Sequence, residues 1–173
     1  PYTTLFRSEA ISLEELALAA RNHAMPLEAL RYDVTPPGLH YVLVHYDIPY
    51  VEPDSWRLDV AGRVARPLTL DLETLQELPR HSAVVTLECA GNGRALLQPR
   101  PVSQPWLTGG VGTAEWTGVR LADVLHEAGV ADDAVDVAFT GVDHGVERGV
   151  AQHYQRGLPV AEAVSGEVLL AYE

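Results

Sequence analysis

The spacing of apolar and polar residues along the chain first predicts four short helices. Ser12 and Glu15 have the spacing of a capping box in front of an apolar stripe. Asp71 is suited to cap a second helix, and Gly129 follows a third as a C-terminal glycine. The helices expected from these patterns cover residues 13–22, 72–78, 118 to the end at Gly129, and 160–164.

Runs of apolar and β-branched residues, bounded by Gly, Pro or Asp, predict the strands. Residues 56–60 alternate between apolar and polar types, which is typical of a half-buried strand. Residues 84–89 are mainly apolar and β-branched, which predicts a buried strand. The expected strands cover residues 40–45, 56–60, 67–70, 84–89, 135–140 and 168–172. Without repeats or an obvious linker, this mixture predicts one domain of helices and strands.

The composition of the chain argues against several classes of function. The chain has 173 residues, of which 47% are hydrophobic, enough for one domain with a core. A net charge of −12 argues against a general nucleic-acid binder, which needs basic surface to replace counterions. The chain has no apolar run of about 20 residues, so no membrane span is expected. A single Cys excludes an internal disulfide framework.

The main candidate for chemistry is the segment from Cys89 to Arg94, which follows the predicted buried strand. Gly and Asn tolerate positive φ, so this segment can turn tightly and leave its N–H groups free for an anion or a cofactor. A thiolate is the form of Cys that binds metal, and a nearby cation stabilises it. A lone Cys after an apolar run is also typical of an inert core residue, so this pattern alone does not identify the site.

Several segments occur in the order and spacing of one known family. They are residues 88–94, 106–116, 118–125 and 167–173, and residues 48–62 are similar to the start of the same domain. Together they resemble the molybdopterin-binding domain of the sulfite oxidase family, over about residues 10–173. The resemblance implies an α+β fold with a mixed sheet, truncated at its C-terminus, and molybdopterin as the cofactor.

The ends of the chain suggest an incomplete domain. Residues 1–8 match a translated sequencing adapter, and we interpret them as an artefact. Residues 9–173 are then a partial molybdopterin-binding oxidoreductase domain, because the chain ends inside the predicted strand 168–172. Its C-terminal part and any dimerisation domain are expected to be missing, as is the family's catalytic Tyr.

The resemblance implies catalytic roles for three residues. Cys89 matches the Cys whose thiolate binds molybdenum in the family, and a soft thiolate suits such a metal. Arg94 matches an Arg that holds the anionic substrate, a task for which a bidentate cation is suited. Trp106 matches a tryptophan that lines the same pocket, although it is equally compatible with a hydrophobic core.

The resemblance also implies the contacts with the cofactor. Tyr41 and His45 fall in the segment that wraps the pterin, and Asp143 falls where a pterin-contacting Asp is expected. Asn92, in the turn after Cys89, completes this set. His45 is also compatible with a histidine on a surface strand.

One position departs from the family pattern. Leu43 stands where the family has a second substrate-binding Arg, and Val44 replaces an Asn. A pocket with one cation fewer binds a small divalent anion less well, which puts sulfite in doubt as the substrate. The function implied by the resemblance is oxygen-atom transfer to sulfite or a related small oxyanion. Reduction of an S-oxide is the alternative within the same superfamily.

The resemblance implies partners as well. A small oxyanion is the expected substrate, and an external one-electron acceptor, such as a cytochrome, would receive the electrons. A homodimer would form through the missing C-terminal domain. No nucleic-acid partner is expected.

Three further alternatives remain open. A zinc hydrolase would use some of the seven His, but no His-Glu-x-x-His or paired-Cys spacing occurs. A cysteine-nucleophile enzyme would pair Cys89 with a distant His, such as His45 or His153. A cofactor-free relative would use the same fold for binding, although the presence of both Cys89 and Arg94 argues against it.

Overall fold

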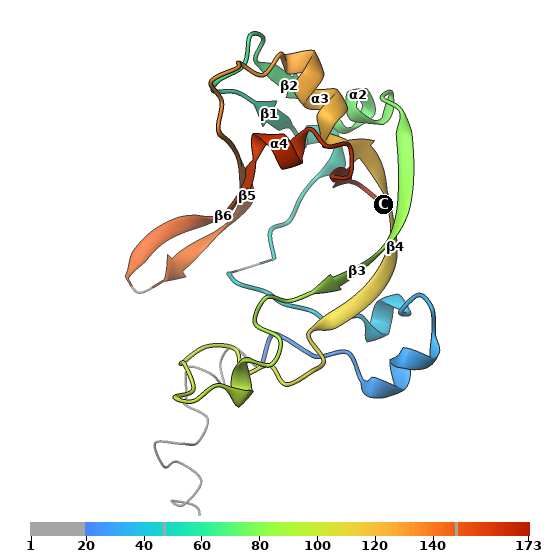
Figure 1. Ribbon diagram of the computed structural model, residues 1–173, viewed down its shortest axis with the longest axis vertical. Helices are drawn as coiled ribbons and strands as arrows, with labels where there is room; N and C mark the ends of the chain where they lie inside the picture. Colours follow the sequence, from blue (N-terminus) through green and yellow to red (C-terminus); the bar gives the residue numbers. More distant parts are fainter. Residues whose placement is uncertain (1–19, 47, 148) are drawn as a thin grey trace, which may run out of the picture. The chain divides into compact units, whose positions relative to one another are not determined.

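The computed structural model describes residues 20–46, 48–147 and 149–173 (Figure 1). Its helices are α2 (Leu72–Gln76), α3 (Leu121–Ala128) and α4 (Val160–Ala163). Its strands are β1 (Leu58–Val60), β2 (Leu68–Leu70), β3 (Arg80–Glu88), β4 (Val111–Arg120), β5 (Asp136–Glu147), β6 (Val150–Pro159) and β7 (Leu169–Ala171). This mixture confirms the α+β class. The adapter-like residues 1–8 and nearly all of the predicted helix 13–22 lie outside the described residues.

The chain folds into two compact units. The first unit comprises Pro1–Val44 and Val84–Glu115, and the second comprises His45–Ala83 and Trp116–Glu173. Strands β3 and β4 contribute residues to both units. The sheets have the strand orders β1-β2, β3-β4-β7 and β5-β6.

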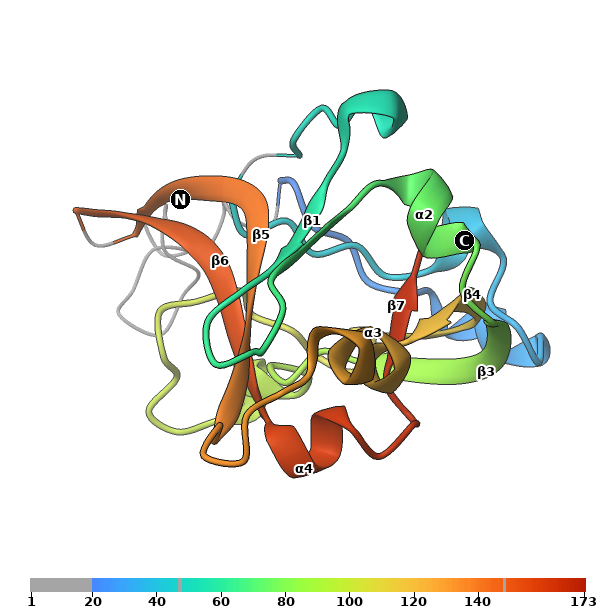
Figure 2. The same ribbon diagram turned by 90° about the horizontal axis from the view of Figure 1, so that it is seen from above.

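The hydrophobic core of the second unit is built around α3. Leu121, Val124 and Leu125 are buried, and Val124 is fully buried. On one side Val124 packs with Leu70, Leu75 and Val119. On the other side Leu121 and Leu125 pack with Ala163 of α4. Figure 2 shows helix α4 next to α3. Helix α3 is therefore the element that connects the two hydrophobic clusters.

Helix α3 begins three residues later than the sequence predicts. Gly118, Val119 and Arg120 are the last residues of β4 and pair with β7. A Cβ on Gly118 would lie 2.1 Å from the backbone oxygen of Leu170, so this close approach of two strands requires glycine. The prediction that the helix ends at Gly129 is confirmed, because Gly129 adopts a φ of 69°.

The strand before Cys89 forms as predicted, but it is not buried. In β3, Val84 is 61% exposed, and Val85 and Leu87 are also exposed. Among the described strands, β3 lies at the edge of its sheet, with β4 as its neighbour. An apolar, β-branched run favours a strand, but burial also requires an element that packs against it. In the described part of the chain, neither core cluster includes a residue of β3.

Two further predictions differ from the structure. Residues 40–45 do not form a strand; within the described part of the chain they contribute one isolated bridge, which joins Val42 to the loop residue His23. The strand predicted over 135–140 continues to Glu147 as β5 and pairs with β6, which the sequence analysis missed. Nearly all of β6 is exposed, so its sequence lacks the alternating pattern of a half-buried strand.

The remaining elements confirm the local predictions. β1, β2 and β7 lie within the segments expected to form strands, and α4 matches its predicted helix. Asp71 caps α2 as predicted, because its carboxylate accepts a hydrogen bond from the Thr74 N–H at 2.8 Å.

Candidate functional site

Cys89 lies directly after β3, where the chain leaves the sheet. Its backbone N–H donates to the Gly110 carbonyl oxygen at 2.7 Å, and its carbonyl oxygen accepts from the Asn92 N–H at 2.8 Å. The thiol is free and partly exposed. Two backbone hydrogen bonds therefore fix the residue while its thiol stays accessible.

The side chain of Asn92 holds the turn after Cys89 in place. Its Nδ2 donates to Oε1 of Glu88 at 2.9 Å and to the Thr108 carbonyl oxygen at 3.4 Å. Its Oδ1 accepts from the Gly110 N–H at 3.0 Å. Asn92 thus joins the end of β3 to the segment before β4, and its predicted contact with a cofactor stays a prediction.

The turn uses most of the N–H groups that were expected to be free for an anion. The backbone N–H groups of residues 92–94 donate to carbonyl oxygens of the same unit, so the prediction is wrong for these three. Gly93, at a φ of 79°, instead begins the 3₁₀ helix Arg94–Leu96. In the part of the chain that the structure describes, the N–H groups of Ala90 and Gly91 donate no hydrogen bond.

The guanidinium of Arg94 lies over Gly91. A Cβ on Gly91 would come within 2.3 Å of Nη2, so the missing side chain makes room for the cation. Nη1 donates to Oγ of Ser103 at 3.1 Å and to the Gln104 carbonyl oxygen at 3.2 Å. Among the described residues, Arg94 forms no ion pair with a carboxylate. Its charge is therefore oriented by neutral groups and not neutralised by them.

Trp106 is both a buried aromatic residue and part of a cavity wall. Its side chain is 3% exposed, and the ring of Tyr41 meets it edge-on at 6.1 Å between centroids. Its buried Nε1 has no hydrogen-bond partner in the described part of the chain. Trp106 is therefore a core residue of the first unit, and its predicted place in a substrate pocket stays a prediction.

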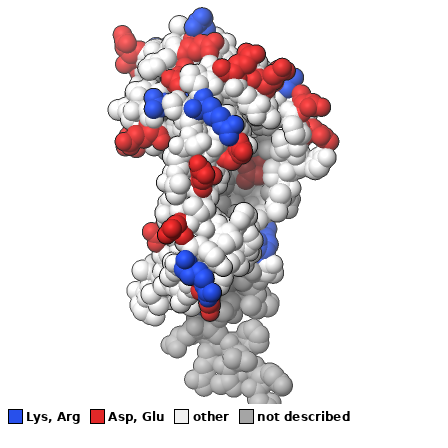
Figure 3. Space-filling view, turned by 90° about the vertical axis from the view of Figure 1, so that its right-hand side faces the viewer, with Lys and Arg blue, Asp and Glu red and all other residues white. Residues whose placement is uncertain are grey.

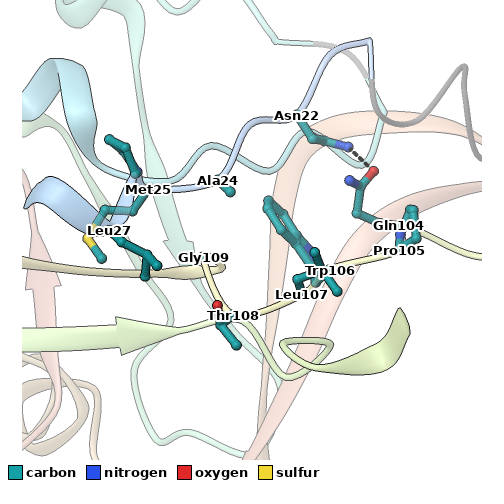
Figure 4. A pocket seen from close by; sticks show the side chains of 11 residues that line it. Asn22, Ala24, Met25, Leu27, Gln104, Pro105, Trp106, Leu107, Thr108 and Gly109 are labelled. Carbon is teal, nitrogen blue, oxygen red and sulfur yellow. Dashed lines mark hydrogen bonds between the residues drawn. The ribbon is translucent and has the colours of Figure 1, made fainter. Parts of the chain in front are cut away.

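A cavity of about 440 Å³ lies beside Trp106 in the first unit (Figure 4). At one end, Nδ2 of Asn22 donates to Oε1 of Gln104 at 3.1 Å, as the dashed line shows. The cavity is lined by Asn22, Ala24, Met25, Pro26, Leu27, Gln104, Pro105, Trp106, Leu107, Thr108 and Gly109. Its walls are therefore mainly apolar, with a few amide and hydroxyl groups.

Gly110 is the point where three predicted site residues meet. A Cβ built on it would lie 3.1 Å from Oδ1 of Asn92, 3.3 Å from Cβ of Cys89 and 3.4 Å from Cδ2 of Trp106. This position was not predicted from the sequence. Its signal is the Gly109-Gly110 pair directly before a strand, since glycine there indicates a close approach of other groups.

The two remaining predicted contacts belong to the second unit. The ring of His45 lies 5.0 Å from the ring of Tyr154 on β6. Asp143 lies on β5 where the register shifts between Thr140 and His144, and this irregular segment faces Tyr154 across the hairpin. The structure therefore brings both residues next to Tyr154, which the sequence analysis missed.

The described residues give no support for a zinc hydrolase. No three side chains of His, Cys, Asp or Glu in residues 20–46, 48–147 and 149–173 are grouped so that they could hold a metal ion, as a zinc hydrolase requires. On the face drawn in Figure 3, acidic and basic side chains are interspersed with uncharged surface, and no continuous basic area is visible there. No helix of the described chain is long and apolar enough to cross a membrane.

Comparison with known proteins identifies the family. The family model described as "Oxidoreductase molybdopterin binding domain" matches residues 45–173, so the chain belongs to this family of oxidoreductase domains. The resemblance to the sulfite oxidase family is confirmed by two relatives. The chain is 39% identical over 147 residues to mitochondrial sulfite oxidase of Homo sapiens, covering 81% of this chain and 26% of that protein. It is 40% identical to sulfite oxidase of Gallus gallus, covering 81% and 32%.

Two further proteins widen the comparison. Nitrate reductase [NADH] 1 of Phaseolus vulgaris is 33% identical over 80% of the chain and 17% of its own length. The crystal structure of the sulfane dehydrogenase SoxCD from Paracoccus pantotrophus matches with a TM-score of 0.68 and 26% identity, covering 81% of this chain and 34% of that one. The chain thus spans about a third or less of the length of the proteins named here. The predicted cofactor, molybdopterin, is the one that the family description names.

Proposed function

We propose that the protein is a molybdopterin-dependent oxidoreductase of sulfite oxidase type, with Cys89 as the protein ligand of molybdenum. The observation that carries this proposal is the meeting of Cys89, Asn92 and Trp106 around Gly110. A soft thiolate is a suitable ligand for molybdenum, and the thiol of Cys89 is free and partly exposed. When bound, the cofactor supplies oxygen-atom transfer coupled to a two-electron redox change.

The polar groups near Cys89 fit such a cofactor. Nε1 of Trp106 is a buried donor without a partner among the described residues, and an unsatisfied buried donor is unfavourable. The N–H groups of Ala90 and Gly91 are two further donors in the same turn. Oxygen atoms of the cofactor or of a bound anion would satisfy these donors. Tyr41, His45, Asn92 and Asp143 are proposed as the remaining cofactor contacts.

We propose a small oxyanion as the substrate, with Arg94 as the residue that binds it. Ser103 and Gln104 fix the guanidinium without neutralising it, which leaves its charge for an anion. With Leu43 in place of a second Arg, binding of the anion depends more strongly on Arg94. Trp106 would exclude water from the same pocket.

Sulfite is the substrate favoured by the similarity to sulfite oxidases. Its oxidation to sulfate takes one oxygen atom from water and releases two protons and two electrons. An external acceptor is therefore needed, and we propose a one-electron acceptor such as a cytochrome. The similarity to a nitrate reductase favours a second candidate, the reduction of a small oxyanion or an S-oxide, which would consume electrons instead.

Steady-state assays of the cofactor-loaded protein test this proposal. Sulfite with a one-electron acceptor, and nitrate or a sulfoxide with a reduced donor, are offered as substrates in turn. In Arg94→Gln the KM for the oxyanion should rise about ten- to hundredfold, because charge-assisted hydrogen bonds are lost. Arg63→Gln is the control, since Arg63 forms an exposed ion pair with Asp133 in the second unit. No turnover of any of these substrates, or equal KM values in the two variants, would contradict the assignment.

A further inference from the structure

We propose that His144 and His153 form a binding site for a divalent transition-metal ion, in addition to the molybdenum ligand Cys89. His144 lies on β5 and His153 on β6, and the two residues are paired in the register of the hairpin. Side chains paired across antiparallel strands lie on the same face of the sheet, with Cβ atoms about 4.5–5.5 Å apart. The hairpin therefore presents two imidazole rings side by side.

The separation of the two rings matches that of two ligands of one ion. Their centroids are 5.6 Å apart, and their planes are inclined at 46°. With metal–nitrogen bonds of about 2.0–2.1 Å and a tetrahedral angle, two imidazoles on one ion have centroids about 5.2 Å apart. Both side chains are exposed, so small rotations about their χ angles can turn a nitrogen of each ring toward a shared ion.

A hydrogen bond favours the tautomer of His144 that can bind a metal ion. Its Nδ1 lies 3.3 Å from the carbonyl oxygen of Val142, which can only accept a hydrogen bond. This contact favours the tautomer with the proton on Nδ1 and leaves the lone pair of Nε2 for a metal. Metal-binding histidines in proteins commonly donate their second nitrogen to a carbonyl oxygen in this way.

The chemistry of the pair selects the class of ion. Neutral imidazole suits Zn²⁺, Cu²⁺ and Ni²⁺, whereas Mg²⁺ and Ca²⁺ prefer oxygen ligands. Among the described residues, no third His, Cys, Asp or Glu completes a group around the pair, so water would fill the other positions. The net charge of −12 favours the approach of any cation. The proposed site thus has two protein ligands and is open to solvent.

Titration of the full chain with Zn²⁺ by calorimetry tests the proposal, together with EPR of the Cu²⁺-loaded protein. His144→Gln and His153→Gln should each weaken Zn²⁺ binding by about tenfold or more, corresponding to about 1.4 kcal/mol. The EPR spectrum should show hyperfine coupling to two imidazole nitrogens, which either variant reduces to one or none. His126→Gln is the matched control, because His126 is a single exposed His on α3.

Two outcomes would overturn the proposal. One is that His144→Gln and His153→Gln bind Zn²⁺ as tightly as the unchanged protein. The other is that the control variant His126→Gln loses the ion to the same extent. Circular dichroism of each variant shows whether the hairpin is intact, so that loss of binding is not mistaken for unfolding.

Discussion

The two compact units are each stabilised in a different way. The second unit has two hydrophobic clusters around α3, in which Val119 and Val124 are fully buried. In the first unit, the turn after Cys89 is held by the Asn92 side chain and by backbone hydrogen bonds. The difference indicates that hydrophobic packing around α3 stabilises the second unit, while polar contacts of the first unit set the shape of the turn after Cys89.

The largest effect on stability is expected from the core of the second unit. Leu125 is 4% exposed and packs against Leu121 and Ala163. Leu125→Ala should lower the free energy of unfolding by about 2–5 kcal/mol, because it leaves a cavity. Leu96→Ala is the control, since Leu96 is 68% exposed and should change stability by less than about 0.5 kcal/mol. Denaturant unfolding measures both, and equal effects would contradict the comparison.

A somewhat smaller effect is expected at the contact between β4 and β7. In Gly118→Ala the new Cβ would lie 2.1 Å from the backbone oxygen of Leu170, and a backbone atom cannot rotate away. We expect a loss of about 1–3 kcal/mol from this overpacking. Gly157→Ala on β6 is the matched control, because no atom lies within 4 Å of its Cβ position. If thermal melting shows the same shift for both variants, the strand contact is less tight than described.

Substitutions in the turn of the first unit should change the reactivity of Cys89 more than the free energy of unfolding. Asn92→Ala removes hydrogen bonds to Glu88, Thr108 and Gly110, and we expect it to cost about 1–2 kcal/mol. The turn should then open, so that a thiol reagent reacts faster with Cys89. Asn92→Asp keeps the acceptor for the Gly110 N–H but places a second carboxylate beside Glu88, so charge repulsion should open the turn as well. An unchanged reaction rate in Asn92→Ala would show that this side chain does not hold the turn.

The smallest effect concerns the cap of α2 and depends on pH. The side chain and the backbone N–H of Thr74 hydrogen-bond to the carboxylate of Asp71 and lower its pKa below the ordinary value of 3.8. Because the pKa is lowered on folding, the charged cap stabilises the fold above pH 3.8, and this contribution is lost as the pH falls through the lower folded value. Asp71→Asn keeps an acceptor but cannot titrate. The difference in melting temperature between Asp71→Asn and the unchanged protein should therefore become smaller in acid. A difference that does not change with pH would contradict this.

Local signals in the sequence predicted the local features correctly. Asp71 and Gly129 specify their helix ends through backbone geometry that involves only their neighbours. Cys89, Arg94 and Trp106 were selected from motif order and spacing, which do not depend on knowing the fold, and their roles stay predictions. Features that depend on tertiary contacts were not predicted, including the exposure of β3 and the hydrogen bond from the Gly93 N–H to the Leu107 carbonyl oxygen.

Two close approaches in the site could have been predicted from the positions of glycines. Gly110 and Gly91 each lie where a side chain would collide with a predicted site residue. Glycine marks such a close approach in the sequence, but it does not say which group approaches. The contact of His45 with Tyr154 could not be predicted, because the strand that carries Tyr154 had no recognisable pattern.

The central claim, that Cys89 binds the molybdenum of a pterin cofactor, is tested most directly by metal and pterin analysis of Cys89→Ser beside the unchanged protein. Both proteins are purified from a host that makes the cofactor, and sulfite turnover is measured on the same samples. We expect about one molybdenum per chain in the unchanged protein, because a single thiolate provides one metal position. Cys89→Ser should keep its fold and most of its pterin but lose turnover. Full activity in Cys89→Ser, or no molybdenum in the unchanged protein, would contradict the claim.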